Sequence, residues 1–94
     1  MMLHDATLLG IHYAWEARSL TINVRTSDGE RELRFGEVVR VEIPQLQPWG
    51  PSVSVNTVRV TPGESASSRI EVRMQSGDVI VIECNVDRDR LSLE

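Results

Sequence analysis

Apolar and polar residues alternate along most of this chain with a period of two residues, which is the spacing of a half-buried β-strand. From Thr7 to Trp15 the alternation predicts a strand with one face formed by Leu9, Ile11, Tyr13 and Trp15. We expect Trp15 to be buried on that face. A second strand, predicted by the alternation of Leu20, Ile22 and Val24, can pair back on the first as a hairpin, and Asp28-Gly29 predicts the next turn.

The middle of the chain contains a glycine within an otherwise regular pattern. The apolar residues on either side of Gly36 all have odd numbers: Leu33, Phe35, Val39, Val41 and Ile43. We therefore expect one face to continue through Gly36 as a bent strand or as two short strands. A phase-shifting bulge at Gly36 fits the pattern less well.

The second half predicts three more strands. Val53 and Val55 share one face whereas Val58 and Val60 share the other, which indicates a bulge near Asn56-Thr57. A clean alternation follows at Ile70, Val72 and Met74, and Ser76-Gly77-Asp78 predicts a hairpin turn. The next segment, 79–82, is apolar on both faces, as expected of an inner strand.

These elements together predict the fold class. About seven short strands, separated by turn signals and accompanied by little or no helix, indicate an all-β protein. The hairpin connections favour a small antiparallel sandwich or a partly open barrel. We see no linker that divides the chain, so residues 1–94 are expected to form a single β domain.

Strand alternation does not explain the proline-rich segment between the two halves. Trp49 lies between Pro48 and Gly50-Pro51, so a rigid loop displaying an aromatic ring is expected. The candidate binding residues are those of this loop and the polar positions that follow it: Pro48, Trp49, Gly50, Pro51, Ser52, Ser54 and Asn56. Trp49 either contacts a partner or folds back over the open end of the core, and the sequence leaves both possibilities open.

Composition excludes several classes of function. The chain has 94 residues and a net charge of −4, and its ten basic residues are scattered among acids, so nucleic-acid binding is not expected. No stretch reaches the ~20 apolar residues of a membrane-spanning helix. The single cysteine, Cys84, rules out an internal disulfide and fits a reducing compartment, so we expect a cytoplasmic protein without membrane contact.

Few residues suggest catalysis or metal binding. His4, Asp5 and His12 are the only group resembling metal ligands, and further ligands at recognisable spacing are missing. Cys84 is in phase with Ile80 and Ile82, which is typical of a small buried hydrophobe. We therefore expect no metal site, no cofactor and no enzymatic activity. An enzyme using Asp5 with His4 or His12 is the least favoured alternative.

Several short motifs resemble those of a family of small bacterial all-β domains. These motifs are Leu3-His4-Asp5-Ala6-Thr7-Leu8, the block Pro48-Trp49-Gly50-Pro51-Ser52, and Gln75-Ser76-Gly77-Asp78. The resemblance spans most of the chain and implies a stand-alone bacterial domain. It implies no particular activity.

The sequence favours a non-enzymatic protein-interaction domain. A sandwich of this size has exposed strand edges and a small core, and symmetric pairing covers both, so a homodimer is expected. An immunity or regulatory protein that binds another protein would suit the size and acidity. The alternative is a carbohydrate or small-ligand binding module in which the ligand stacks on Trp49.

Overall fold

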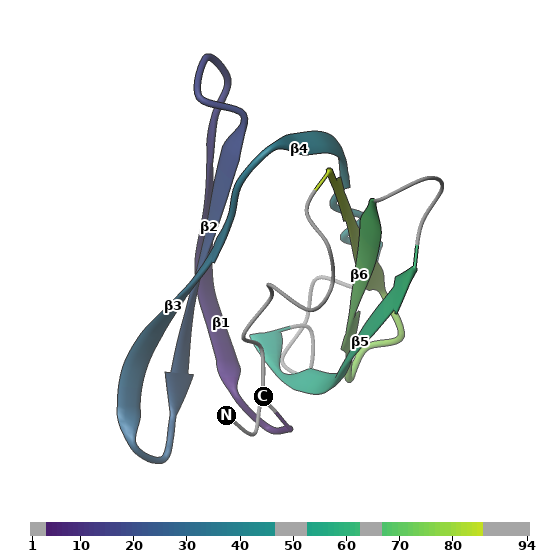
Figure 1. Ribbon diagram of the computed structural model, residues 1–94. Coiled ribbons are helices and arrows are strands. Elements are labelled where there is room, and N and C mark those ends of the chain that lie inside the picture. The colour runs from purple at the N-terminus through teal and green to yellow at the C-terminus, as the bar shows by residue number, and fades with distance from the viewer. Residues whose placement is uncertain (1–3, 47–52, 63–66, 86–94) are drawn as a thin grey trace.

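The computed structural model describes residues 4–46, 53–62 and 67–85. Within these residues the chain forms seven strands in two antiparallel sheets that face each other (Figure 1). The first sheet has three strands in the order β1 (Thr7–Ala14), β2 (Ser19–Thr26) and β3 (Gly29–Phe35). The second has four, in the order β4 (Val38–Glu42), β7 (Val79–Cys84), β6 (Ser68–Met74) and β5 (Val55–Pro62). The predicted all-β antiparallel fold is confirmed.

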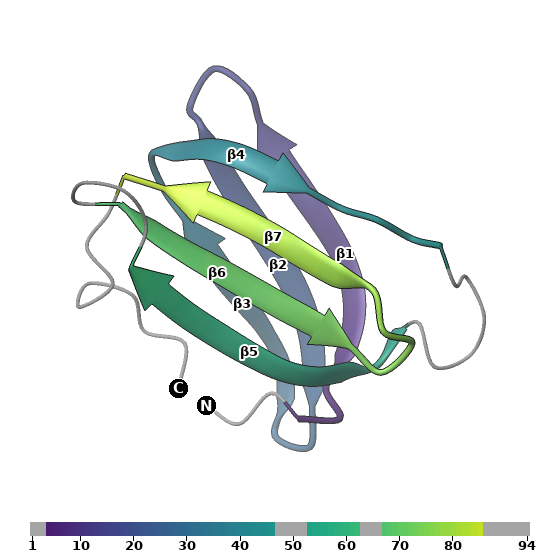
Figure 2. The ribbon, with the colours of Figure 1, turned by 90° about the vertical axis from the view of Figure 1, so that its right-hand side faces the viewer.

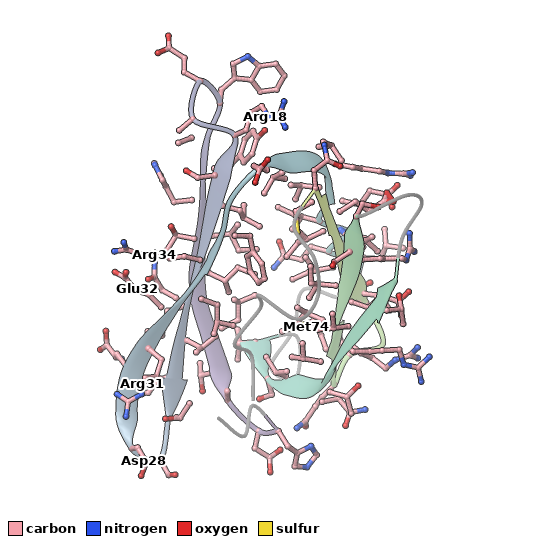
Figure 3. The ribbon with its side chains drawn as sticks, in the orientation of Figure 1. Arg18, Asp28, Arg31, Glu32, Arg34 and Met74 are labelled. Carbon is pink, nitrogen blue, oxygen red and sulfur yellow. The ribbon has the colours of Figure 1, made fainter. Side chains whose placement is uncertain are left out.

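The core lies between the sheets and consists of the alternating apolar residues. Figure 3 shows Met74 pointing into this space, whereas Arg34 and Glu32 point away from it. The most deeply buried large side chains are Leu20, Ile22, Phe35, Ile70 and Ile82. The predicted inner strand is confirmed, because β7 lies between β4 and β6.

Three strands contain an irregularity in their pairing, and only one of these was predicted. The register shift between Val55 and Thr57 confirms the bulge expected near Asn56. In β1 the register shifts between Leu8 and Gly10, so the expected placement of Leu9 beside Ile11 is wrong. Leu9 is 42% exposed, while Leu8 packs against the core.

The expectation of one continuous face through Gly36 is also wrong. Val38 is buried and Val39 is 54% exposed, because Glu37 adopts a left-handed conformation (φ 51°) and the register shifts again between Val38 and Arg40. At Glu37 the chain leaves the first sheet and enters the second. Two backbone hydrogen bonds fix this crossing, from Val38 N to Arg18 O (2.8 Å) and from Asn85 N to Glu37 O (2.9 Å).

Residues before β1 join the two sheets at one corner. Asp5 N donates to Val55 O (2.8 Å) and Val55 N donates to Ala6 O (2.9 Å), next to an isolated bridge between Thr7 and Ser54. The Gln75 side-chain amide donates a hydrogen bond to the Asp5 carboxylate. The first residues of β1 are therefore held against the second sheet. In the described part of the chain, no helix has the length and hydropathy needed to cross a bilayer.

Candidate functional site

Exposed apolar side chains gather along one side of the sandwich. Strand β1 is an edge of the first sheet and β4 is an edge of the second, and Figure 2 shows them on the same side of the molecule. We call this side the β1–β4 side. It has a hollow at each end. One is lined in part by Leu9 and Ile43, and the other by Trp15, Val39 and the charged Arg18.

The larger hollow, which we call the apolar groove, lies between the first half of β1 and the segment that follows β4. Its volume is about 350 Å3. Its walls and floor are formed by Leu8, Leu9, Gly10, Ile11, Ile43, Pro44, Gln45, Val53, Met74, Asp78 and Ile80. Leu9, Ile43 and Val53 are each between 42% and 50% exposed, so the groove presents apolar surface to water. Such a surface on a small protein is typical of a contact site.

The smaller hollow, which we call the tip hollow, lies at the opposite end of β1. It has a volume of about 300 Å3 and is lined by Tyr13, Trp15, Arg18, Val38 and Val39. The Tyr13 and Trp15 rings meet edge to face, with centroids 6.0 Å apart and planes at 87°. Figure 3 shows Arg18 beside the β1–β2 turn at this end of the molecule.

Trp15 does not have the predicted burial. Its relative exposure is 81%, the largest among the exposed hydrophobic residues of the described chain. Strand β1 ends at Ala14, and Trp15 begins the turn that Arg18 N closes onto Trp15 O (3.2 Å). The ring therefore projects beyond the core. A large, rigid and exposed aromatic ring is a common anchor of protein interfaces.

Strand β1 itself connects the two hollows. Its sequence, TLLGIHYA, contains no Asp, Glu, Lys or Arg. The other three edge strands each carry at least one, with Glu30 and Arg31 among four in β3, Arg40 and Glu42 in β4, and Arg59 in β5. Charges on edge strands oppose pairing with another chain. Among the described edges, β1 is thus the one without this protection.

Most of the binding residues predicted from the sequence cannot be compared with the structure. Trp49, Pro48, Gly50, Pro51 and Ser52 lie outside the described residues. Residues on either side of this loop do reach the groove, because Pro44, Gln45 and Val53 line it.

The remaining two predicted binding residues, Ser54 and Asn56, lie at the corner that joins the sheets. Ser54 O accepts from Gln75 N (2.8 Å), and Asn56 O lies 2.8 Å from Nδ1 of His4. Both residues are half-buried. Their backbone contacts hold the start of β5 in place.

The three possible metal ligands do not form a cluster. His4 Nε2 lies 3.5 Å from Asp5 Oδ2, and His12 lies farther along β1. No group of three His, Cys, Asp or Glu side chains with metal-binding geometry occurs in residues 4–46, 53–62 and 67–85. Cys84 has 0% exposure, which confirms its prediction as a buried residue.

Charged side chains on the outer faces pair with each other. Arg69 Nε donates to Glu71 Oε2 (3.0 Å), and Arg40 contacts both Glu42 (2.7 Å) and Glu83 (3.6 Å). The hydrogen bond and charge of Glu42, followed by the charge of Glu83, raise the pKa of the Arg40 guanidinium. Exposed pairs of this kind contribute at most about 1 kcal/mol each to stability.

Two pairs of consecutive apolar residues are the signal in the sequence for the exposed residues of this site. Consecutive apolar residues at Leu8-Leu9 and at Val38-Val39 allow either phase of alternation, so one member of each pair must leave the core. Both of the displaced residues, Leu9 and Val39, lie on the β1–β4 side.

Comparison with known proteins gave no match to a protein-family model, to a curated protein or to a solved structure.

Proposed function

We propose that this chain is a non-enzymatic protein-interaction domain that associates with itself, and that its interface lies on the β1–β4 side. The observation that carries this proposal is the set of exposed apolar side chains on this side, Leu9 and Ile43 at the groove and Trp15 and Val39 at the tip hollow. The edge strand between the two hollows, β1, contains no Asp, Glu, Lys or Arg. Interfaces are enriched in aromatic residues and depleted in charge at their centres. Strand β1 has both properties, because it carries Tyr13, is followed by Trp15 and contains no Asp, Glu, Lys or Arg.

We also propose that the protein is bacterial and cytoplasmic. The family resemblance, the net charge of −4 and the single buried cysteine support a bacterial, cytoplasmic domain. An immunity or regulatory role, in which the self-associated form binds and blocks another protein, fits a small acidic domain. The Trp49 loop belongs to the proposed interface or borders it, because its flanking residues Pro44 and Val53 line the groove.

The test introduces one negative charge into the groove. Ile43 is 50% exposed and contributes little to the core, so Ile43→Asp is expected to fold and to lose self-association. Thr57→Asp, which adds the same charge at an exposed position of β5, is the matched control and should associate as the wild type does. Sedimentation velocity over a range of concentrations measures the mass, and circular dichroism checks the fold. A wild-type chain that stays monomeric up to millimolar concentration contradicts the proposal.

A further inference from the structure

The geometry points to a second copy of this chain as the occupant of the β1–β4 side. We propose that β1 of one copy pairs antiparallel with β1 of the other across a two-fold axis, which joins two three-stranded sheets into one of six strands. This inference deepens the proposed self-association and rests on it. It names the strand, the register and the anchor of the dimer.

The distribution of charge selects β1 among the four edge strands. Antiparallel pairing of an edge with its own copy places the side chains of that strand beside side chains of the same strand in the second copy. For the charged edges such pairing buries or opposes charges, and the chain has a net charge of −4 that already repels a second copy. Pairing through β1 brings no Asp, Glu, Lys or Arg of the two paired strands together, because β1 contains none.

The register follows from the part of β1 that is free to pair. Thr7 already forms a bridge with Ser54, so the free edge extends from Leu8 to Trp15, where the turn begins. Residues directly opposite each other point to the same face of a sheet, so the two residue numbers of each pair must add to an even number. Registers centred on Ile11 and on His12 each use seven residues of this edge, 8–14 and 9–15 respectively. Only the second includes Trp15 in the pairing, so the proposed dimer uses the register centred on His12. It places the two His12 residues opposite each other, and Ile11 of one copy opposite Tyr13 of the other.

This register brings the tip hollow of one copy to the apolar groove of the other. Trp15 of one copy comes level with the irregularity at Leu9 of the second copy, and Leu9 lines the apolar groove. The edge-to-face contact holds the Trp15 ring on the side of Tyr13, which packs against the core. Because a two-fold axis perpendicular to the sheet keeps both inner faces on the same side, the Trp15 ring reaches the groove end of the second copy. The symmetry axis repeats this contact, so each copy supplies one anchor and one groove.

The surface area that these contacts bury approaches that of the smaller stable interfaces. Two buried tryptophans remove on the order of 300–500 Å2 of surface from water. The groove walls lose a comparable area, so the two anchors alone approach the roughly 1,200 Å2 of the smaller stable interfaces. Backbone pairing along β1 adds to this area.

The first experiment tests the register by disulfide trapping of His12→Cys. Opposed residues of an antiparallel pair have Cα atoms roughly 4.5–5.5 Å apart, which suits a disulfide. Thr21→Cys is the matched control, because Thr21 neighbours His12 on β2 and its two copies would lie three strand spacings apart, roughly 14 Å. Cys84 is fully buried and does not compete. Under mild oxidation, we expect covalent dimer from His12→Cys and only background from Thr21→Cys.

The second experiment tests the anchor. Trp15→Ser should weaken dimerisation about 30-fold, the loss expected for an interface hot spot. Trp15→Phe keeps an aromatic ring and should recover most of the affinity. Sedimentation equilibrium of both variants gives the dissociation constants, and circular dichroism verifies that each is folded.

The outcomes separate this inference from the proposed function. A wild-type dimer that His12→Cys does not trap, or that Trp15→Ser leaves unchanged, overturns the β1 pairing while self-association stands. Equal trapping of His12→Cys and Thr21→Cys also overturns it. A wild-type chain that is monomeric at every concentration overturns both proposals.

Discussion

Replacing Trp15 by alanine tests whether this residue lies outside the core of the monomer. Since Trp15 is 81% exposed, only about a fifth of its surface is removed from water. That fraction is on the order of 40 Å2, which contributes about 1 kcal/mol at 25 cal/mol per Å2. The edge-to-face contact with Tyr13 adds roughly 1 kcal/mol. We expect Trp15→Ala to lower the free energy of unfolding by about 1–2 kcal/mol.

The assay is urea denaturation followed by far-ultraviolet circular dichroism, at a protein concentration where the midpoint no longer depends on concentration. Under this condition dimerisation does not contribute to the measured stability. A tryptophan in the core would cost about 3–5 kcal/mol when truncated to alanine. A loss of 3 kcal/mol or more would therefore refute the exposed position of Trp15, and the anchor of the proposed dimer with it.

Three further predictions concern the sandwich itself and are measured by the same denaturation assay. Ile70 and Ile82 both have 0% exposure, so shortening either side chain leaves a cavity in the core. Ile70→Ala should lower the free energy of unfolding by about 2–5 kcal/mol, whereas Ile82→Val, which removes a single methylene, should lower it by only about 0.5–1.5 kcal/mol. Equal losses would contradict this packing. Gly29→Ala should lower the free energy of unfolding by about 1 kcal/mol or more, because Gly29 has φ 116°. At Gly36 an added Cβ meets no atom within 4 Å, so Gly36→Ala should be neutral or should stabilise the fold by about 0.4–1 kcal/mol. Arg69→Gln should change stability by less than about 1 kcal/mol despite its ion pair, and a larger effect would show that the outer-face pairs support the fold.

The regular strands could be predicted from the sequence because each has one unambiguous apolar face. In β2 the inward residues are separated by polar ones, so only one phase of the alternation buries them. Strand β7 is apolar on both faces, which predicts an inner strand. The bulge at Asn56 was also predictable, since Val55 and Val58 cannot share a face without an extra residue.

The exposed residues of the β1–β4 side could not be predicted in the same way. Leu8-Leu9 and Val38-Val39 satisfy either phase, and tertiary pairing decides which member is buried. Trp15 extends the alternation of β1, but it lies beyond the last residue that the second sheet covers, and a pattern along one strand contains no information about where the opposite sheet ends. The proposed contact surface consists of these residues, which local alternation assigned to the core or left ambiguous.

The position of β7 has a consequence for the order in which the molecule is built. Within the first sheet, β1, β2 and β3 pair in sequence order, so this sheet can form before the second half of the chain leaves the ribosome. Strand β4 is different, because its partner in the finished sheet is β7, the last of the described strands. Throughout synthesis β4 remains without that partner until the β6–β7 hairpin emerges and inserts beside it. A nascent chain that stops before β7 thus exposes the inner edges of both β4 and β6, and β7 is the described strand that joins them into one sheet.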